Sequence, residues 1–196
     1  MIYYMQIETL NPIKIRVFGE ERFDFLQNII TNDLNKLDKK LESYILSPQG
    51  KILYQIIITK SDESYDIFCS NDQNDLSQFL NKYALLSNVK LVIEKTDNTK
   101  YDKNYILNQL SVGKIDANLL KQSSLLPSEV NDELVDYSKG CFVGQEVVSR
   151  IKHRQLNKKK LTIKVFKKEP NNFMDKSELL LQIDNYLILR ETISDN

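Results

Sequence analysis

The feature that most constrains the fold is a change of hydrophobic period along the first half of the chain. In residues 13–17, isoleucine and valine alternate with basic residues, which is the period of a half-buried strand. Phe23, Leu26 and Ile30 then recur at the spacing of one helix face. The two periods side by side predict a helix packed on a sheet.

The same alternation of periods continues through residue 93. Strands are predicted at 43–46 and 52–59, joined through Ser47-Pro48-Gln49-Gly50, where Pro fixes φ at the second turn position and Gly closes the turn. A strand at 65–69, a helix over 76–86 and a strand at 89–93 follow. This order favours an α+β fold, with helices on one face of a largely antiparallel sheet, over a doubly wound fold.

The second half of the chain has weaker patterns. Polar residues at 96–104 indicate a connection, followed by a predicted short strand at 105–107 and a helical piece at 115–120. Three more strands are predicted at 161–165, 179–181 and 186–189. The expected organisation has three parts, with boundaries at 1–96, 97–168 and 169–196.

Composition excludes several classes of function. Lys and Arg total 27, and so do Asp and Glu, so the net charge indicates no particular partner. The single histidine, His153, excludes a catalytic triad or a multi-histidine metal site within the chain. Two cysteines without zinc-site spacing indicate neither a disulfide scaffold nor a metal site.

No secretion signal is evident and the apolar runs are far shorter than the roughly 20 residues of a membrane span. We therefore expect a reducing, cytoplasmic setting and no membrane association.

The two cysteines lie in different neighbourhoods. Cys69 shares a predicted strand face with apolar residues, which indicates a small buried side chain. Cys141 lies between Gly140 and Gly144, and a helix predicted over 145–150 would direct its N-terminal amides toward it, which favours an anion or a thiolate. Two interpretations of Cys141 remain open from these residues: a nucleophile or soft ligand, and a buried thiol in a tight loop.

The segment around Cys141 resembles a known signature. Lys139-Gly140-Cys141-Phe142-Val143-Gly144-Gln145-Glu146, with Arg150 four residues on, is similar to the K-G-C-[YF]-x-G-Q-E-x-x-x-R pattern of YgfZ-type folate-binding proteins, relatives of the glycine-cleavage T-protein. Supporting similarities are Phe25-Leu26-Gln27, Thr31-Asn32-Asp33, Pro48-Gln49-Gly50-Lys51 and Leu126-Pro127-Ser128-Glu129. We refer to residues 139–150 as the signature segment.

This resemblance implies a T-protein-like fold with antiparallel sheets covered by helices, its C-terminal barrel shortened or absent. It also implies a central cavity for tetrahydrofolate and a role in making or maintaining iron–sulfur enzymes, including those that modify tRNA. The resemblance identifies Cys141 as the residue that carries the chemistry. The candidate cofactor-binding residues are Lys139, Gln145, Glu146, Arg150, Gln27, Asn32 and Asp33.

Three functional classes remain: a folate-dependent assembly or repair factor, an aminomethyltransferase-like one-carbon enzyme, and a non-catalytic interaction domain on the same scaffold. An aminomethyltransferase of this kind does not need a cysteine here and has a longer C-terminal portion, so the signature favours the first class. Whether the chain is an enzyme stays open. The expected partners are a reduced folate and iron–sulfur client or assembly proteins.

Residues 151–168 carry eight Lys or Arg and no Asp or Glu. A solvated strand face, a site for the glutamate carboxylates of folate, and a site for RNA phosphate would each have this composition. Direct nucleic-acid binding is disfavoured because Phe166 is the one Phe, Tyr or Trp ring in the run, and RNA-binding surfaces normally pair charges with stacking rings.

Overall fold

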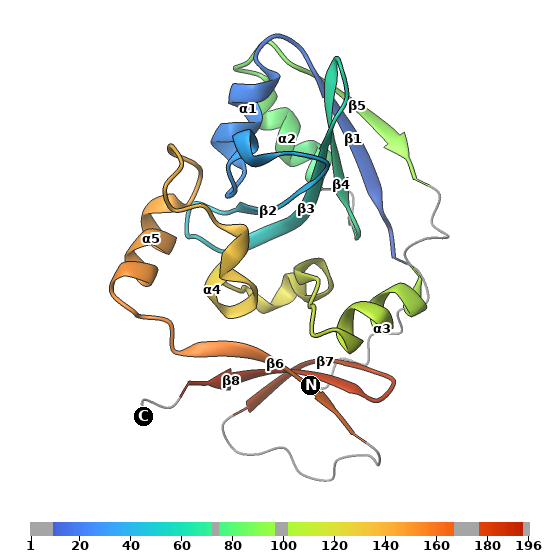
Figure 1. The fold of residues 1–196 in the computed structure, drawn as a ribbon, viewed down its shortest axis with the longest axis vertical. Coiled ribbons are helices and arrows are strands. Elements are labelled where there is room, and N and C mark those ends of the chain that lie inside the picture. The colour runs from blue at the N-terminus through green and yellow to red at the C-terminus, as the bar shows by residue number, and fades with distance from the viewer. Residues whose placement is uncertain (1–9, 72–74, 97–101, 167–176, 194–196) are drawn as a thin grey trace.

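The computed structural model describes residues 10–71, 75–96, 102–166 and 177–193, and arranges them in two antiparallel sheets with helices around them (Figure 1). The strands are β1 (Ile13–Phe18), β2 (Leu41–Leu46), β3 (Ile52–Lys60), β4 (Ser64–Cys69), β5 (Lys90–Lys95), β6 (Lys159–Val165), β7 (Ser177–Ile183) and β8 (Tyr186–Thr192). The α-helices are α1 (Arg22–Ile29), α2 (Leu76–Ala84), α3 (Lys103–Ser111), α4 (Pro127–Val130) and α5 (Gln145–His153). Short 3-10 helices are η1 (Leu34–Lys36), η3 (Ala117–Ser123) and η4 (Asp132–Leu134). The predicted α+β fold is confirmed.

The first sheet has the strand order β2-β3-β4-β1-β5, and α1 and α2 cover one of its faces (Figure 1). Alternation along β3 shows how this face is built. Tyr54, Ile56 and Ile58 are buried against the helices, whereas Gln55 and Ile57 between them are half-buried on the other face. The period of two in the sequence therefore sorts side chains between a core and a second, more polar face.

The hairpin predicted between β2 and β3 is present. The two strands pair antiparallel, and the turn closes through a hydrogen bond of 2.8 Å from the Gly50 amide to the Ser47 carbonyl. Gly50 adopts a φ of +75°, which a residue with a Cβ adopts at a cost. The Pro-Gln-Gly sequence thus fixes the hairpin register.

Two predictions in the middle of the chain are wrong. The short strand expected at 105–107 is part of α3, because the Asp102 side chain caps the Tyr105 amide at 3.0 Å and Ile106 and Leu110 bury one helix face. The helical stripe expected to reach residue 86 ends earlier, since α2 stops at Ala84 and Leu86 is 93% exposed. The helical piece expected at 115–120 corresponds to η3, which begins two residues later.

A side-chain amide attaches η3 to the first sheet. The Asn118 side chain accepts from the backbone amide of Gln55 at 2.9 Å and donates to the backbone carbonyl of Gln55 at 2.8 Å. These are the two bonds that a neighbouring strand would make, and the paired part of β4 ends at Phe68, opposite Ile57. Asn118 therefore continues the sheet where β4 leaves it.

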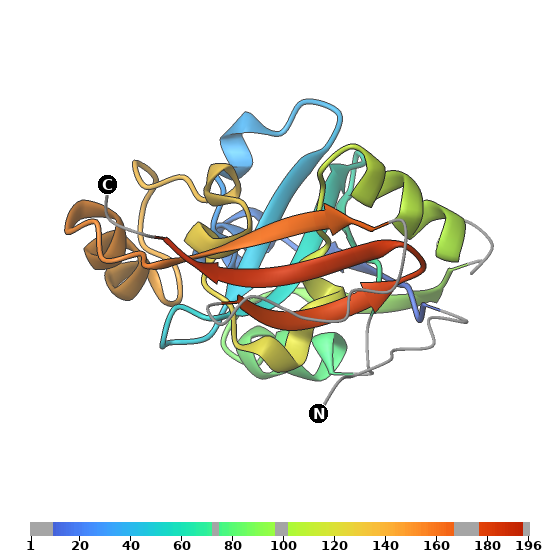
Figure 2. The ribbon, with the colours of Figure 1, turned by 90° about the horizontal axis from the view of Figure 1, so that it is seen from below.

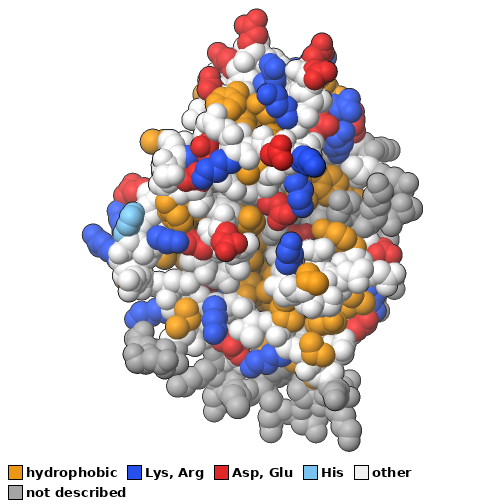
Figure 3. Space-filling view, viewed as in Figure 1, with side chains coloured by type: hydrophobic (Ala, Val, Ile, Leu, Met, Phe, Trp, Pro, Cys, Tyr) orange, Lys and Arg blue, Asp and Glu red, His pale blue; other side chains and the backbone are white. Residues whose placement is uncertain are grey.

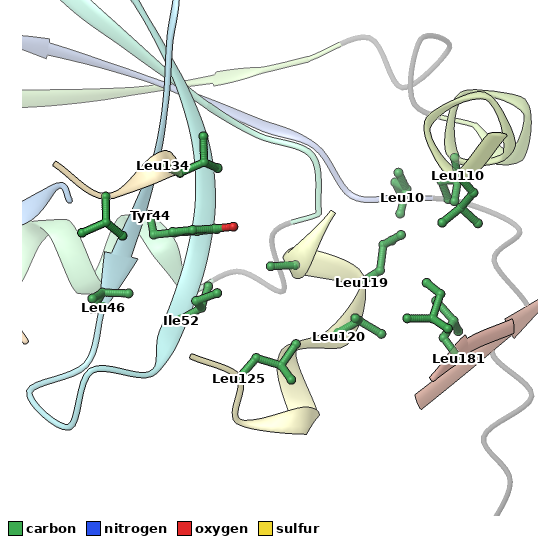
Figure 4. Packing of buried hydrophobic residues seen from close by; sticks show 14 of the residues in the cluster. Leu10, Tyr44, Leu46, Ile52, Leu110, Leu119, Leu120, Leu125, Leu134 and Leu181 are labelled. Atoms are coloured by element: carbon green, nitrogen blue, oxygen red, sulfur yellow. The ribbon is translucent and has the colours of Figure 1, made fainter. Parts of the chain in front are cut away.

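A second core lies between the hairpin, η3 and the C-terminal strands. In Figure 4 Tyr44 on β2 extends toward the segment of Leu119, and Leu181 on β7 faces the same segment from the other side. These residues are all at most 7% exposed. The first sheet is thus continuous with the central helices through apolar packing as well as through Asn118.

The C-terminal strands form an open antiparallel sheet of order β6-β8-β7, with no closed barrel among the described residues. Figure 2 shows this sheet lying across one side of the molecule. The basic strand β6 pairs with β8, and Lys164 contacts Glu191 at 2.6 Å. Strands β6 and β8, which lie on either side of residues 168 and 169, share hydrogen bonds within this sheet. No helix among the described residues is long and apolar enough to cross a membrane.

A buried ion pair ties this sheet to the central helices. The Glu129 carboxylate accepts hydrogen bonds from two nitrogens of Arg190, Nε at 2.8 Å and Nη2 at 2.6 Å. It also accepts from the Leu126 backbone amide at 2.8 Å. The two side chains are 2% and 14% exposed. Glu129 therefore caps α4 and neutralises Arg190 of β8 with one carboxylate.

We expect Arg190→Met to destabilise the protein by about 3–5 kcal/mol, because it leaves the Glu129 carboxylate buried without its partner. Urea unfolding at neutral pH measures the change. Lys164→Met is the matched control: it removes a half-exposed partner of Glu191 in the same sheet and should cost less than about 1 kcal/mol. Equal losses in the two variants would contradict the assigned role of Arg190.

Candidate functional site

The signature segment leads from η4 into α5 and lies against the C-terminal end of α1. The Val143 amide donates to the Asn28 carbonyl at 3.3 Å, and Phe142 is 7% exposed within the second core. Cys141 between these anchors is exposed. The segment therefore presents its thiol outward while the neighbouring ring is held inside.

Lys139 is buried and its ammonium is used within the fold. Its Nζ donates to the carbonyls of Gln27 and Ile30 at 2.7 Å and to that of Asn32 at 3.1 Å, and it lies 5.2 Å from the Phe142 ring centroid. Helix ends leave such carbonyls without intrahelical partners, and Lys139 satisfies them at the end of α1. Burial lowers the pKa of Lys139 to about 8, although the nearby carboxylates of Asp33 and Asp136 act in the opposite direction.

Gly144 brings the signature segment into contact with the β2–β3 turn. Its φ is +83°, and a Cβ there would lie 2.5 Å from the Ser47 carbonyl oxygen and 3.2 Å from the Gly50 Cα. Val147 and Val148 pack against Gly50 in turn. Two motifs that are far apart in the sequence are therefore joined by backbone-to-backbone packing, which leaves no room for a side chain at position 144.

The candidate residues after α1 form a local network. Gln27 donates to the Asp33 carboxylate at 2.8 Å and accepts from the Leu34 amide at 2.9 Å. Asn32 donates to the Glu42 carbonyl at 3.0 Å. Bonds from the Asn35 amide and from Gln27 hold the pKa of Asp33 below its usual value. The structure brings Gln27, Asn32 and Asp33 close to Lys139, where they shape the turn that Lys139 binds.

The remaining candidates lie on α5, facing outward. Glu146 and Arg150 form an i,i+4 ion pair of 2.6 Å in which the side chains are 84% and 54% exposed. Gln145 is half-buried and reaches the Lys139 carbonyl at 3.5 Å. The Arg150 charge is thus shared with Glu146.

Cys69 and Cys141 differ as their sequence neighbourhoods predict. Cys69 is 0% exposed on β4, packed in the core beneath α1 and α2, whereas Cys141 is exposed. Among the described residues, no three His, Cys, Asp or Glu side chains gather in a cluster that could hold a metal ion.

A cavity of about 910 Å³ lies elsewhere, between the open face of the first sheet, α3, η3, η4 and the middle of β6. Its apolar wall includes Ile57, Phe68 and Ile163. Its polar lining consists of Lys40, Glu42, Gln55, Ser70, Gln109, Lys114, Asp116, Asn118, Asn131, Glu133 and Thr162. None of the eight residues singled out from the sequence lines it. Sequence reasoning missed this site, although polar Glu42 and Gln55 within otherwise apolar strands were a signal that could have found it.

The polar groups of the cavity are fixed to different degrees. Asp116 accepts from the Ser70 hydroxyl and from the Asn118 amide, and burial raises its pKa despite these bonds. The side-chain oxygen Oε1 of Gln55 accepts from the Ala117 backbone amide at 2.9 Å, which leaves the side-chain NH₂ group as the donor for a ligand. Glu42 contacts the exposed Lys40 at 3.2 Å at the rim.

The arrangement suits an organic ligand with a flat apolar body and several polar atoms. The volume lies in the range of small-molecule sites, and carboxylates, amides and apolar walls converge on it. Over the molecular face in Figure 3, acidic and basic side chains are interspersed, without a large patch of one sign.

The described fold closely matches a solved enzyme. It aligns with the glycine cleavage system aminomethyltransferase T from Bartonella henselae with a TM-score of 0.66 at 10% sequence identity, covering 94% of this chain and 77% of that one. This chain therefore has the aminomethyltransferase T fold.

The sequence is also similar to a curated protein, the mitochondrial iron-sulfur cluster assembly factor IBA57 homolog of Mycosarcoma maydis. The identity is 22% over 218 residues, which covers 75% of this chain. The chain spans about half the length of that relative, 53%. No family model matches the chain. The structural match shows the fold, and the sequence match is to a protein named as an iron–sulfur cluster assembly factor; neither singles out the YgfZ-type proteins.

The buried ammonium of Lys139 generates a prediction about pH. Its pKa is about 8 in the folded state and about 10.4 in an unfolded chain, so between these values the unfolded state binds more protons. The free energy of unfolding should rise from pH 8 to pH 10, by roughly 1 kcal/mol or more. Urea unfolding across this range measures the slope. Lys139→Met should be less stable at pH 7 and should lack the rise; an identical slope in the variant would contradict the assignment.

Proposed function

We propose that the protein binds tetrahydrofolate in the central cavity and supports the assembly or repair of iron–sulfur enzymes, including tRNA-modifying ones, through Cys141. The observation that carries the proposal is the cavity of about 910 Å³ with convergent carboxylate and amide groups in an aminomethyltransferase T fold. The similarity to a protein named as an iron–sulfur cluster assembly factor supports the second part.

The cavity residues fit a reduced folate chemically. The Glu42 carboxylate and the Gln55 amide lie on neighbouring strands of the same sheet face and can accept from and donate to the amino and carbonyl groups of a pterin ring. Ile57 and Phe68, paired across β3 and β4, provide an apolar surface for the ring face. Lys40 and Lys114 at the exposed rim would attract the glutamate carboxylates.

The residues of the signature segment act outside the cavity in this proposal. Lys139, with Gln27, Asn32 and Asp33, holds the loop on which Cys141 is exposed. Gln145, Glu146 and Arg150 contribute an exposed helical surface beside it. Cys141 then meets an iron–sulfur client or assembly protein from solution, in a reducing, cytoplasmic setting that keeps its thiol free.

An aminomethyltransferase-like one-carbon enzyme is the alternative that the fold favours. The two functions differ in their need for the thiol: transfer of a one-carbon unit would take place at the folate in the cavity, and Cys141 does not line the cavity. An assembly or repair factor acting through Cys141 requires both sites. Experiments on the two sites separately therefore distinguish the alternatives.

Calorimetric titration with tetrahydrofolate tests the cavity. We expect Glu42→Gln to weaken binding by roughly tenfold, because a charged acceptor is replaced by a neutral group at a ligand contact. Glu146→Gln is the matched control, an exposed carboxylate on α5 that should bind as the unchanged protein does. Loss of binding in Glu146→Gln with normal binding in Glu42→Gln would move the folate site to the signature segment, and no binding by the unchanged protein would refute the proposal.

Support of iron–sulfur enzymes in cells that lack the native protein tests Cys141. Cys141→Ser should abolish the activity without loss of stability, since the thiol is exposed. Cys69→Ala should retain the activity and lose roughly 1 kcal/mol or more of stability, since Cys69 is fully buried. Full support by Cys141→Ser, with folate binding retained, would favour the one-carbon enzyme.

A further inference from the structure

Strand β5 forms an edge of the first sheet. Its inner side is hydrogen-bonded to β1 over Lys90–Lys95, and the described residues place no strand on its outer side. Figure 1 shows β5 at the margin of the sheet, on the right, with α1 and α2 to the left of the strands. An edge strand presents unpaired backbone donors and acceptors, which another strand can use.

The side chains of β5 are separated into an apolar and a charged set. Leu91 and Ile93 lie on the helix-covered face, opposite Val17 and Ile15 of β1. Ile93 is nevertheless 54% exposed, because it lies beyond the cover of α2. The turn from α2 into β5 adds two strongly exposed residues, Leu85 at 85% and Leu86 at 93%.

The open face of β5 carries the other residues. Lys90 is exposed and Val92 and Glu94 are half-buried there, and Glu94 contacts Lys14 at 3.2 Å and Arg16 at 3.1 Å. Within the described residues, Lys90 has no ion-pair partner of its own. The strand therefore has an apolar side that is only partly covered and a positive charge that is not neutralised.

The apolar residues of one β5 strand can pack against those of a second β5 strand, and so can the charged residues. We propose that β5 pairs antiparallel with β5 of a second copy of the chain. A two-fold axis through Val92, perpendicular to the sheet, keeps the helices of both copies on one side. In that register Val92 faces its symmetry mate, Leu91 faces Ile93 of the second copy, and Lys90 faces Glu94. Apolar residues meet apolar residues on the helix side. On the open side, Lys90 joins the ion pairs that Glu94 already makes with Lys14 and Arg16, twice by symmetry.

The register itself favours a second copy as the occupant. Pairing one residue further along would turn the apolar side of one copy against the charged side of the other. The two-fold register avoids this conflict and covers Ile93, whose exposure in the single chain is unfavourable. The result is a ten-stranded sheet made from two five-stranded ones.

Disulfide trapping of the full chain tests the register. Val92→Cys in a Cys141→Ser background should oxidise to a covalent dimer at least tenfold faster than Lys90→Cys, because only residue 92 faces itself across the axis and directly opposed Cβ atoms lie about 4.5–5.5 Å apart. Equal rates, or no covalent dimer with Val92→Cys, would overturn the proposal.

Sedimentation velocity over a concentration series tests the association without added cysteines. The unchanged chain should form a dimer as its concentration rises. Lys90→Glu should weaken the dimer by roughly tenfold, since it replaces two Lys–Glu contacts with two Glu–Glu contacts. Lys82→Glu, the same charge change at an exposed residue of α2, should leave it unaffected. A chain that stays monomeric throughout, or a dimer insensitive to Lys90→Glu, would overturn the proposal.

Discussion

The ammonium of Lys139 is the interaction on which the arrangement around Cys141 depends. The last carbonyls of α1 point away from the helix without partners, and one lysine from a distant part of the chain satisfies three of the carbonyls around that helix end. The same side chain lies over Phe142, whose ring is buried. Cys141 lies between Lys139 and Phe142 in the chain, and it is exposed because these two buried residues fix the loop on either side of it. Lys139, two residues before the thiol in the sequence, therefore stabilises the loop that carries Cys141.

The motifs singled out in the sequence serve the packing, and other residues line the cavity. Gly50 and Gly144 permit two loops to touch, and Glu129 of the Leu-Pro-Ser-Glu segment neutralises Arg190. The cavity is lined instead by single polar residues on strands and by the capped start of η3. The two features are spatially distinct, so the proposed folate-binding role and the proposed thiol role can be tested by separate substitutions.

Local patterns in the sequence were sufficient to predict much of the fold. The strands, the β2–β3 hairpin and the start of α5 follow from periodicity and turn residues, and the burial of Cys69 follows from its place on β4. The helix α3 was missed because three apolar residues in a row suggest a strand, while the capping bond of Asp102 and the burial of Leu110 decide for a helix. The candidate site was predicted less well. Sequence cannot show that a lysine points inward or that Glu42 and Gln55 face a common cavity, because both depend on pairings between distant segments.

The pairing of Glu129 with Arg190 also bears on how the chain acquires its structure. The carboxylate is synthesised 61 residues before the guanidinium that neutralises it. Until β8 has formed, the α4 region holds a charge that can be buried only at high cost, so docking of the central helices and completion of the C-terminal sheet are coupled into one late step. Before Arg190 is available, Glu129 stays in water, and this opposes early burial of the α4 region. The α4 region thus reaches its final, neutralised arrangement only after β8 has been made.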